Sequence, residues 1–230
     1  MTERRRVSYA VIPGAGCAGL TWAEVAEELG AHVLSVPDET SIVAMAAGLE
    51  ATVAEMAAPR VLIGASMGGM VALELARRVE VHGLVLVAAG FGIAVSDRVI
   101  DRMVRNAPDL WHKMARACLG GREDPALIEA IVADYVAGGH EQHIRASTAL
   151  QAYKPEPLPD PPPTIVLWGM EDPAVPLDDH IELAMRCRGA LVPIADAAHV
   201  PYLQQPRVTV EWIRRCGLLA QVAAAQSPAS

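Results

Sequence analysis

The feature that most constrains the fold is a regular alternation of short apolar runs with stretches of helical periodicity. Six runs have the length and β-branched content of buried strands: residues 6–12, 32–36, 60–64, 82–89, 164–169 and 190–195. Most are continuously apolar, which is typical of parallel strands covered on both faces. Helical spacing of apolar residues follows over residues 20–30, 41–57, 67–78, 177–188 and 206–225. The alternation predicts a doubly wound, mostly parallel α/β sheet of about six strands, with ligands at the carboxyl ends of the strands.

One long interval between the fourth and fifth strands interrupts this alternation. It contains four further helical patterns, over residues 97–106, 107–120, 125–139 and 141–153. Ser96 and Asp124 are candidate N-caps, and Pro125 suits the first turn of a helix. We therefore predict an α/β core formed by residues 1–90 and 164–230, with residues 91–163 inserted as a small helical cap.

Composition and charge narrow the class of protein. A chain of 230 residues with 52% hydrophobic composition can bury one sizeable core. The net charge of −8 argues against nucleic acid and anionic membranes as partners, because both attract basic surfaces. The four cysteines are widely spaced without a C-x-x-C pair, which fits reduced thiols in a cytosol. No run approaches the roughly 18 apolar residues of a membrane helix. We expect a cytoplasmic protein without a nucleic-acid or membrane partner.

Ser66 lies in the sequence motif that carries the clearest chemistry. Gly64-Ala65-Ser66-Met67-Gly68 fits G-x-S-x-G, and it lies between a predicted strand and a predicted helix. A nucleophile elbow requires this strand, turn and helix, because the sharp turn exposes the serine hydroxyl above the strand ends. The glycines remove side chains that would collide in such a turn. The alternative interpretation is a tight glycine turn capped by a serine.

Two later segments contain a candidate acid and a candidate base for this serine. The segment "VLWGMEDPAVP" fits a strand followed by G-x-x-D-x-x-x-P, with Asp172 as the acid and Glu171 as a fallback. The segment "ADAAHVPYLQQP" places His199 after a strand and before a proline. With the G-x-S-x-G motif, these segments resemble the α/β-hydrolase superfamily of serine hydrolases and esterases, here lacking the family's first two strands. The resemblance implies that Ser66, Asp172 and His199 are catalytic.

Two departures from the family pattern accompany His199. Ala198 stands where the family has glycine, and Gln204 stands where it has glutamate. Both alter local packing without removing a catalytic atom. The other histidines are predicted to be surface or packing residues, with His180 the only other one near the site.

The loop after the first strand resembles the family's oxyanion loop. In "VIPGAGCAGLTW", Pro13 stands where the family has histidine, and the spacing is similar to that of small methylesterases and hydroxynitrile lyases. The resemblance implies that the backbone N–H groups of Ala15 and Met67 bind the oxyanion. An alternative is a dinucleotide-binding G-x-G-x-x-G formed by the glycines of this loop. Asp38 then lies near the position of the ribose-binding acid.

The resemblance implies hydrolysis of a small carboxylic ester, thioester or lactone through an acyl-enzyme on Ser66. Alternatives are a lyase, C–C hydrolase or cyclase with the same triad, or a non-catalytic ligand-binding member. No cofactor or metal is expected. The predicted partner is a small-molecule substrate with an apolar portion, because the cap is apolar and Met67, Met70 and Met170 lie near the elbow. The alternative is that these methionines belong to the core. The sequence does not fix the oligomeric state.

Overall fold

A six-stranded parallel sheet forms the centre of the molecule. The computed structural model describes residues 6–106 and 109–226. Its strands follow the order β2-β1-β3-β4-β5-β6, and every neighbouring pair is parallel. Their bounds are β1 (Ser8–Ile12), β2 (His32–Val33), β3 (Arg60–Ala65), β4 (Gly83–Val87), β5 (Thr164–Gly169) and β6 (Ala190–Ile194). The predicted parallel α/β architecture is confirmed.

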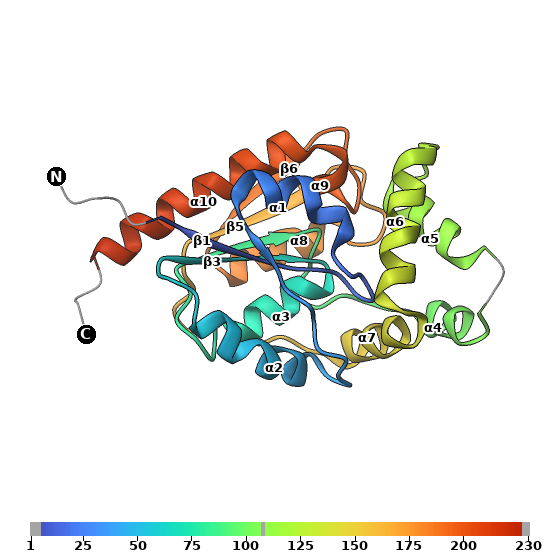
Figure 1. Cartoon of the computed structure of the whole chain (residues 1–230), viewed down its shortest axis with the longest axis horizontal. Helices are drawn as coiled ribbons and strands as arrows, with labels where there is room; N and C mark the ends of the chain where they lie inside the picture. Colours follow the sequence, from blue (N-terminus) through green and yellow to red (C-terminus); the bar gives the residue numbers. More distant parts are fainter. Residues whose placement is uncertain (1–5, 107–108, 227–230) are drawn as a thin grey trace.

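Helices cover both faces of this sheet, as Figure 1 shows. On one side are α1 (Ala23–Leu29) and α10 (Pro206–Gln226), and on the other are α2 (Ile42–Ala54), α3 (Met67–Leu75) and α8 (Leu177–Arg186). Each face has its own apolar cluster, so the strand residues are buried from both sides. This explains the continuous rather than alternating hydrophobicity of the central strands.

Four helices lie between β4 and β5, at the carboxyl ends of the strands (Figure 1). They are α4 (Asp97–Val104), α5 (Leu110–Cys118), α6 (Pro125–Gly138) and α7 (His140–Ala152). The Asp124 side chain accepts from the Leu127 amide at 3.1 Å, whereas the Ser96 side chain makes no capping hydrogen bond to a described residue. Residues 107–108 of the predicted second helix lie outside the described residues. The division of the chain into a core and a cap remains a prediction.

Two local differences from the predicted elements have clear causes. The second strand is only two residues long, because it lies at the sheet edge and Pro37 follows after a few residues. The segment after His199 forms an additional short helix, α9 (Pro201–Gln204), before α10 begins at Pro206. Each of these helices starts at a proline, which is favourable in a first turn.

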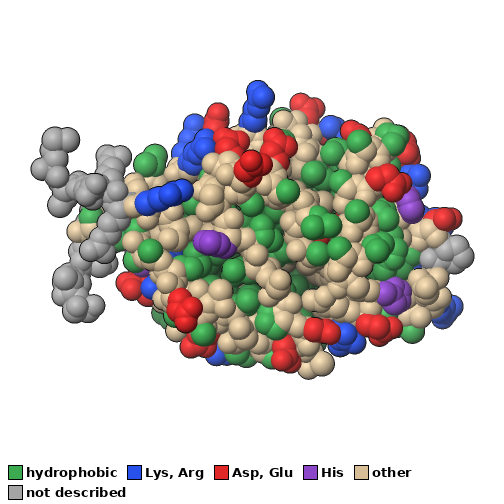
Figure 2. Space-filling model, in the orientation of Figure 1, with side chains coloured by type: hydrophobic (Ala, Val, Ile, Leu, Met, Phe, Trp, Pro, Cys, Tyr) green, Lys and Arg blue, Asp and Glu red, His purple; other side chains and the backbone are tan. Residues whose placement is uncertain are grey.

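The face shown in Figure 2 carries side chains of both charges as well as hydrophobic ones. The charged side chains are interspersed among the hydrophobic ones. Within residues 6–106 and 109–226, no helix combines the length and the apolar character needed to cross a bilayer.

Glycines allow α3 to lie directly against the ends of β1 and β3. A Cβ atom on Gly68 would lie 2.0 Å from the Ile12 carbonyl oxygen, and one on Gly64 would lie 2.3 Å from the Gly68 oxygen. These neighbours are backbone atoms, which cannot rotate away as a flexible side chain can. The glycines of G-x-S-x-G are therefore required by close packing around the turn.

Replacing Gly68 with alanine is expected to lower the free energy of unfolding by about 3 kcal/mol, because the new methyl group collides with backbone. Urea denaturation measures the change. Gly121→Ala is the matched control: it has φ +80° but nothing within 4 Å of its Cβ position. We expect it to cost only about 1 kcal/mol of backbone strain. An equal or smaller loss in Gly68→Ala would contradict the packing argument.

Candidate active site

Ser66 occupies the turn between β3 and α3 in a strained backbone conformation. Its φ is 50° and its ψ is −119°, a combination that L-residues rarely adopt. Such a conformation costs about 1–3 kcal/mol and persists only where the surroundings enforce it. The Ser66 amide donates to the Val87 carbonyl at 2.8 Å, which ties the turn to the end of β4. The turn places the partly exposed Ser66 in the wall of a pocket.

His199 and Asp172 meet at the same end of the sheet, after β6 and β5 respectively. Nδ1 of His199 lies 2.9 Å from Oδ2 of Asp172 and 3.1 Å from Oδ1. The Asp172 side chain is fully buried, whereas the His199 side chain is 14% exposed and lines the same pocket as Ser66. The structure thus brings all three predicted residues to one place and joins two of them by hydrogen bonds.

The Asp172 carboxylate is held ionised. Burial opposes ionisation, but the hydrogen bond with His199 and the electrostatic interaction with its ring favour it. Oδ1 also accepts from the amides of Ala174 at 2.8 Å and Val175 at 3.1 Å. Together these donors hold the pKa of Asp172 below its ordinary value of 3.8. Glu171, the alternative acid, is exposed and pairs with Arg122 at 2.6 Å.

The two departures beside His199 interact with each other. The Ala198 amide donates to Oε1 of Gln204 at 2.8 Å, so the glutamine side chain supports the loop that carries His199. The same loop packs on Gly169, where a Cβ atom would lie 1.9 Å from the Ala198 oxygen. The local packing role expected for these positions agrees with these contacts.

The predicted oxyanion loop lies beside Ser66. A Cβ atom on Gly14 would lie 3.7 Å from the Ser66 Cβ, and Ala15 lines the pocket. Met67 is the first residue of α3, so its N–H has no partner within the helix. The two predicted oxyanion donors therefore belong to segments on either side of the Ser66 turn. Positive charge at the helix N-terminus favours an anion there.

The loop 13–21 is anchored by one carboxylate from α6. Oδ1 of Asp134 accepts from the amides of Gly19 at 2.7 Å and Leu20 at 3.0 Å. Oδ2 accepts from the amide of Thr21 at 3.2 Å and from its hydroxyl at 2.6 Å. Asp134 is 1% exposed, so these charge-assisted bonds replace its hydration. A buried acid far away in the sequence thereby fixes the loop that follows Ala15.

Replacing Asp134 with asparagine is expected to lower the free energy of unfolding by on the order of 2–3 kcal/mol. The amide NH₂ group would face backbone N–H donors, leaving buried polar groups unpaired. Chemical denaturation measures the loss, and Glu129→Gln on the same helix is the control. Glu129 is 69% exposed, and its change is expected to stay within about 0.5 kcal/mol. Equal effects of the two substitutions would show that the Asp134 bonds contribute nothing.

The pocket above Ser66 has a volume of about 370 Å³ and a mainly apolar lining. Helices α4 to α7 supply much of its wall, including Met103 and Met114. Met67, Met70 and Met170 do not line the pocket, and for Met67 and Met70 the alternative of core packing is confirmed. Met67 and Met70 are buried in the core between α3 and the sheet, and Met170 is 51% exposed outside the pocket.

The histidines other than His199 include one that sequence reasoning missed. His143 on α7 lines the pocket, although it was expected to be a surface or packing residue. The signal was weak, because only the fold of α7 over the strand ends brings His143 near Ser66. His180 is buried, and its Nδ1 lies 2.9 Å from the Pro176 carbonyl oxygen. Burial lowers the pKa of His180.

The structure does not favour the dinucleotide-binding alternative. Asp38 pairs with Arg145 at 2.5 Å on the surface, and Gly19 is held by Asp134. Among the described residues, no group of three histidine, cysteine or acidic side chains is placed to hold a metal ion.

Comparison with known families identifies the class of protein. Residues 10–212 match the Alpha/beta hydrolase family. The chain belongs to this family, and the expected superfamily and fold class are confirmed. No curated protein matches the chain.

Solved structures with the same fold include an esterase, a lactone-degrading enzyme and a thioesterase. An esterase from Thermogutta terrifontis with malate bound is 24% identical, covers 94% of this chain and 90% of its own, and has a TM-score of 0.77. An N-acyl homoserine lactone degrading enzyme is 19% identical, with coverages of 92% and 93% and a TM-score of 0.71. The type II thioesterase BorB from the borrelidin biosynthetic cluster is 18% identical, covers 93% of each chain and has a TM-score of 0.70.

Proposed function

We propose that this chain is a serine hydrolase that cleaves a small carboxylic ester, thioester or lactone through an acyl-enzyme on Ser66. The observation that carries the proposal is the positive-φ turn at Ser66, in the wall of the pocket that His199 lines. A binding protein has no need of a strained serine beside a histidine that is bonded to a buried carboxylate.

In the proposed reaction, the Ser66 hydroxyl oxygen attacks the substrate carbonyl carbon and its proton passes to Nε2 of His199. Asp172 keeps the other proton on Nδ1 and stabilises the imidazolium. The carbonyl electron pair moves to the oxygen, which the N–H groups of Ala15 and Met67 bind. His199 then protonates the leaving oxygen or sulfur, and the acyl group remains on Ser66.

A water molecule completes the proposed cycle. His199 takes a proton from the water as its oxygen attacks the acyl-enzyme, and then returns a proton to the Ser66 oxygen as the acid leaves. The same residues therefore serve both halves of the reaction. All the groups needed for this chemistry are amino-acid side chains and backbone amides.

The substrate class follows from the pocket. Its apolar lining and modest volume suit a small acyl or alcohol group with an apolar portion. The esterase, lactone-degrading enzyme and thioesterase that share the fold cover the same range of acyl compounds. The likeness to these structures shows only the fold. The proposal therefore does not choose among an ester, a thioester and a lactone.

A fluorophosphonate probe tests the proposed nucleophile, because it phosphonylates an activated serine. We expect one probe per chain on the wild type and none on Ser66→Ala. Ser147→Ala, which removes another pocket serine, is the matched control and is expected to be labelled like the wild type. Failure of folded wild type to react would overturn the proposal, and labelling that persists in Ser66→Ala would move the nucleophile elsewhere.

A further inference from the structure

Asp134 is a buried acidic group in the pocket wall that the proposed reaction does not use. It lies on α6, is 1% exposed and lines the same pocket as Ser66. An acidic side chain is rarely buried to this degree unless hydrogen bonds replace its hydration. Here every one of those bonds comes from the loop 13–21. The same loop carries Ala15, the predicted oxyanion donor.

Ala15 is the second residue of a β-turn over residues 14–17. The Cys17 amide donates to the Gly14 carbonyl at 3.2 Å, and Gly16, the third residue, has a φ of 66°. A turn closed by one hydrogen bond and containing glycine has many conformations open to it in isolation. The direction of the Ala15 N–H therefore depends on what holds the turn from outside.

The turn is held between Ser66 and α6. A Cβ atom on Gly14 would lie 3.7 Å from the Ser66 Cβ. On the other side, a Cβ atom on Gly138 of α6 would lie 1.9 Å from the Gly16 carbonyl oxygen, so the two backbones are in direct contact. Figure 1 shows the loop after β1 passing beside α6. Ala15 thus lies between a contact to the proposed nucleophile and a contact to α6.

The Asp134 carboxylate fixes α6 on this loop one helical turn before Gly138. It accepts from the amides of Gly19 at 2.7 Å and Leu20 at 3.0 Å, and from the Thr21 hydroxyl at 2.6 Å. Hydrogen bonds to a charged acceptor are stronger than those between neutral groups. Because α6 cannot shift along the loop without breaking several of them, the carboxylate sets where the helix backbone meets the turn.

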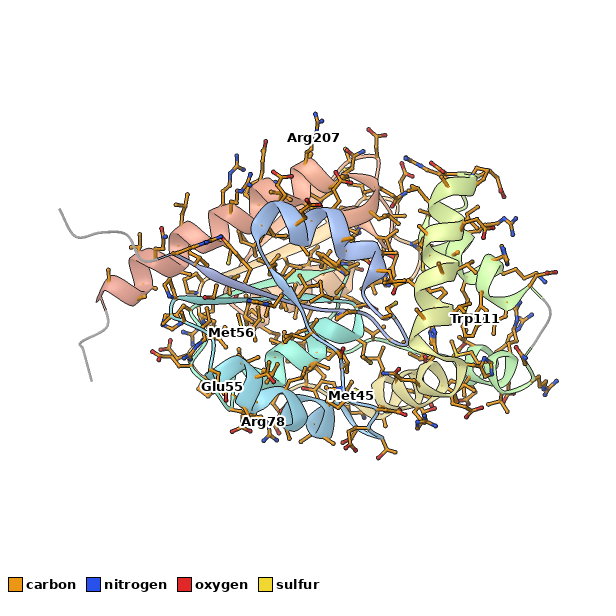
Figure 3. The ribbon with its side chains drawn as sticks, in the orientation of Figure 1. Met45, Glu55, Met56, Arg78, Trp111 and Arg207 are labelled. Carbon is orange, nitrogen blue, oxygen red and sulfur yellow. The ribbon has the colours of Figure 1, made fainter. Side chains whose placement is uncertain are left out.

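Aromatic packing fixes α6 among its neighbours. The ring of Tyr135, the residue after Asp134, lies 5.5 Å between centroids from the ring of Trp111 on α5. Figure 3 shows Trp111 on the side of the molecule formed by α4 to α7. The helix is therefore a firm support for the loop, and Asp134 joins the two.

We propose that Asp134 is a positioning residue, which holds the loop so that the Ala15 N–H meets the oxyanion formed on the substrate. The inference rests on the proposed function. The oxyanion develops only as the serine attacks, so a misplaced donor lowers kcat and leaves binding of the ester largely unchanged. Loss of one oxyanion donor costs a hydrolase on the order of 10²- to 10³-fold in kcat.

Steady-state kinetics of Asp134→Asn on p-nitrophenyl butyrate tests this role, with fluorophosphonate titration to count the folded active sites. We expect kcat per site to fall about 100-fold and KM to change by less than about 3-fold. The pH dependence of kcat/KM is expected to stay that of the wild type, because His199 keeps its bond to Asp172. Glu129→Gln removes an exposed acid from the same helix and is expected to keep wild-type kcat.

A pair of ketones separates positioning from a general loss of structure. With trifluoromethyl butyl ketone, the Ser66 oxygen bonds to the carbonyl carbon, the serine proton passes to His199, and the carbonyl oxygen becomes an oxyanion. Methyl butyl ketone has nearly the same shape but binds as the ketone. In Asp134→Asn, we expect the inhibition constant of the trifluoromethyl ketone to rise about as much as kcat/KM falls. That of methyl butyl ketone is expected to change by less than about 3-fold.

Two further variants act on the same loop without changing the carboxylate. Gly138→Ala pushes against the turn and is expected to lower kcat by about 10-fold or more, and Thr21→Val removes one bond and is expected to lower it about 5-fold. A wild-type kcat in folded Asp134→Asn, a loss confined to KM, or equal weakening of both ketones would overturn the inference.

If Asp134→Asn does not fold, the other two variants replace it. A lower kcat in either then supports the inference, and a wild-type kcat in both overturns it. Fluorophosphonate labelling of wild-type Ser66 separates this result from failure of the proposed function. A labelled wild type with an unaffected Asp134→Asn overturns the inference alone, whereas a folded wild type that is not labelled overturns both.

Discussion

Replacing His199 with alanine is expected to lower kcat for a small ester by about 10⁵- to 10⁶-fold while leaving the fold intact. In the proposed reaction, this substitution removes the group that takes the Ser66 proton and protonates the leaving group. The His199 side chain is 14% exposed at the pocket, and its hydrogen bonds are not what joins the strands. The loss should therefore appear in turnover far more than in thermal stability. Ester hydrolysis followed in a pH-stat, together with a thermal melt, measures both.

His180 provides the matched control for this experiment. It is buried near the same acid, and its Nδ1 interacts with the Pro176 carbonyl oxygen. His180→Asn keeps a nitrogen close to Nδ1 and is expected to retain most of the activity. The assignment of the base would be wrong if His180→Asn abolished turnover and His199→Ala did not.

The sequence was sufficient to predict the sheet because burial leaves a direct pattern in it. Strands β3, β4 and β5 are covered on both faces and therefore appear as uninterrupted apolar runs. At the sheet edge the pattern is less informative: residues 34–36 are apolar or small, yet the strand pairs only over His32–Val33. There the Leu34 amide makes one more bond, to the Val11 carbonyl at 2.8 Å, before Pro37.

The residues of the proposed triad could be predicted from the sequence for a different reason. Ser66 is surrounded by glycines because backbone atoms lie within about 2 Å of where their Cβ atoms would be. Asp172 and His199 follow directly on strands, so the parallel sheet carries both to the same edge. Local sequence thus determined their position once the order of strands was assumed.

The wall of the pocket could not be predicted in this way. Asp134 and His143 lie on helices α6 and α7, and their partners are the loop 13–21 and Trp111. Helical periodicity identifies which face of a helix is apolar, but it does not say over which loop that helix lies. Met67 and Met70 were expected near the pocket for the same reason, since they belong to a helix whose apolar face is turned to the sheet.

Replacing Asp172 with asparagine is expected to lower kcat by about 10⁴-fold. The amides of Ala174 and Val175 donate to Oδ1, so they select the carboxamide oxygen of asparagine at that position. The NH₂ group then faces Nδ1 of His199 and donates to it. Nδ1 must become the acceptor, and the ring proton moves to Nε2, where it prevents His199 from taking the Ser66 proton. The asparagine therefore fixes the wrong tautomer while nearly preserving the volume of the side chain.

The adjacent acid supplies a control with the same change of charge. Glu171 is exposed and pairs with Arg122, so Glu171→Gln is expected to change kcat by less than about 3-fold.

The pH dependence of stability gives a second measurement on Asp172→Asn. Because the pKa of Asp172 is lower in the folded chain, its ionised form stabilises the fold above its unfolded pKa, and this contribution is lost as pH falls through the folded pKa. The free energy of unfolding of the Asp172→Asn protein should therefore fall less than that of the wild type as the pH is lowered through this range. An Asp172→Asn enzyme that keeps wild-type kcat would rule out tautomer control by this carboxylate.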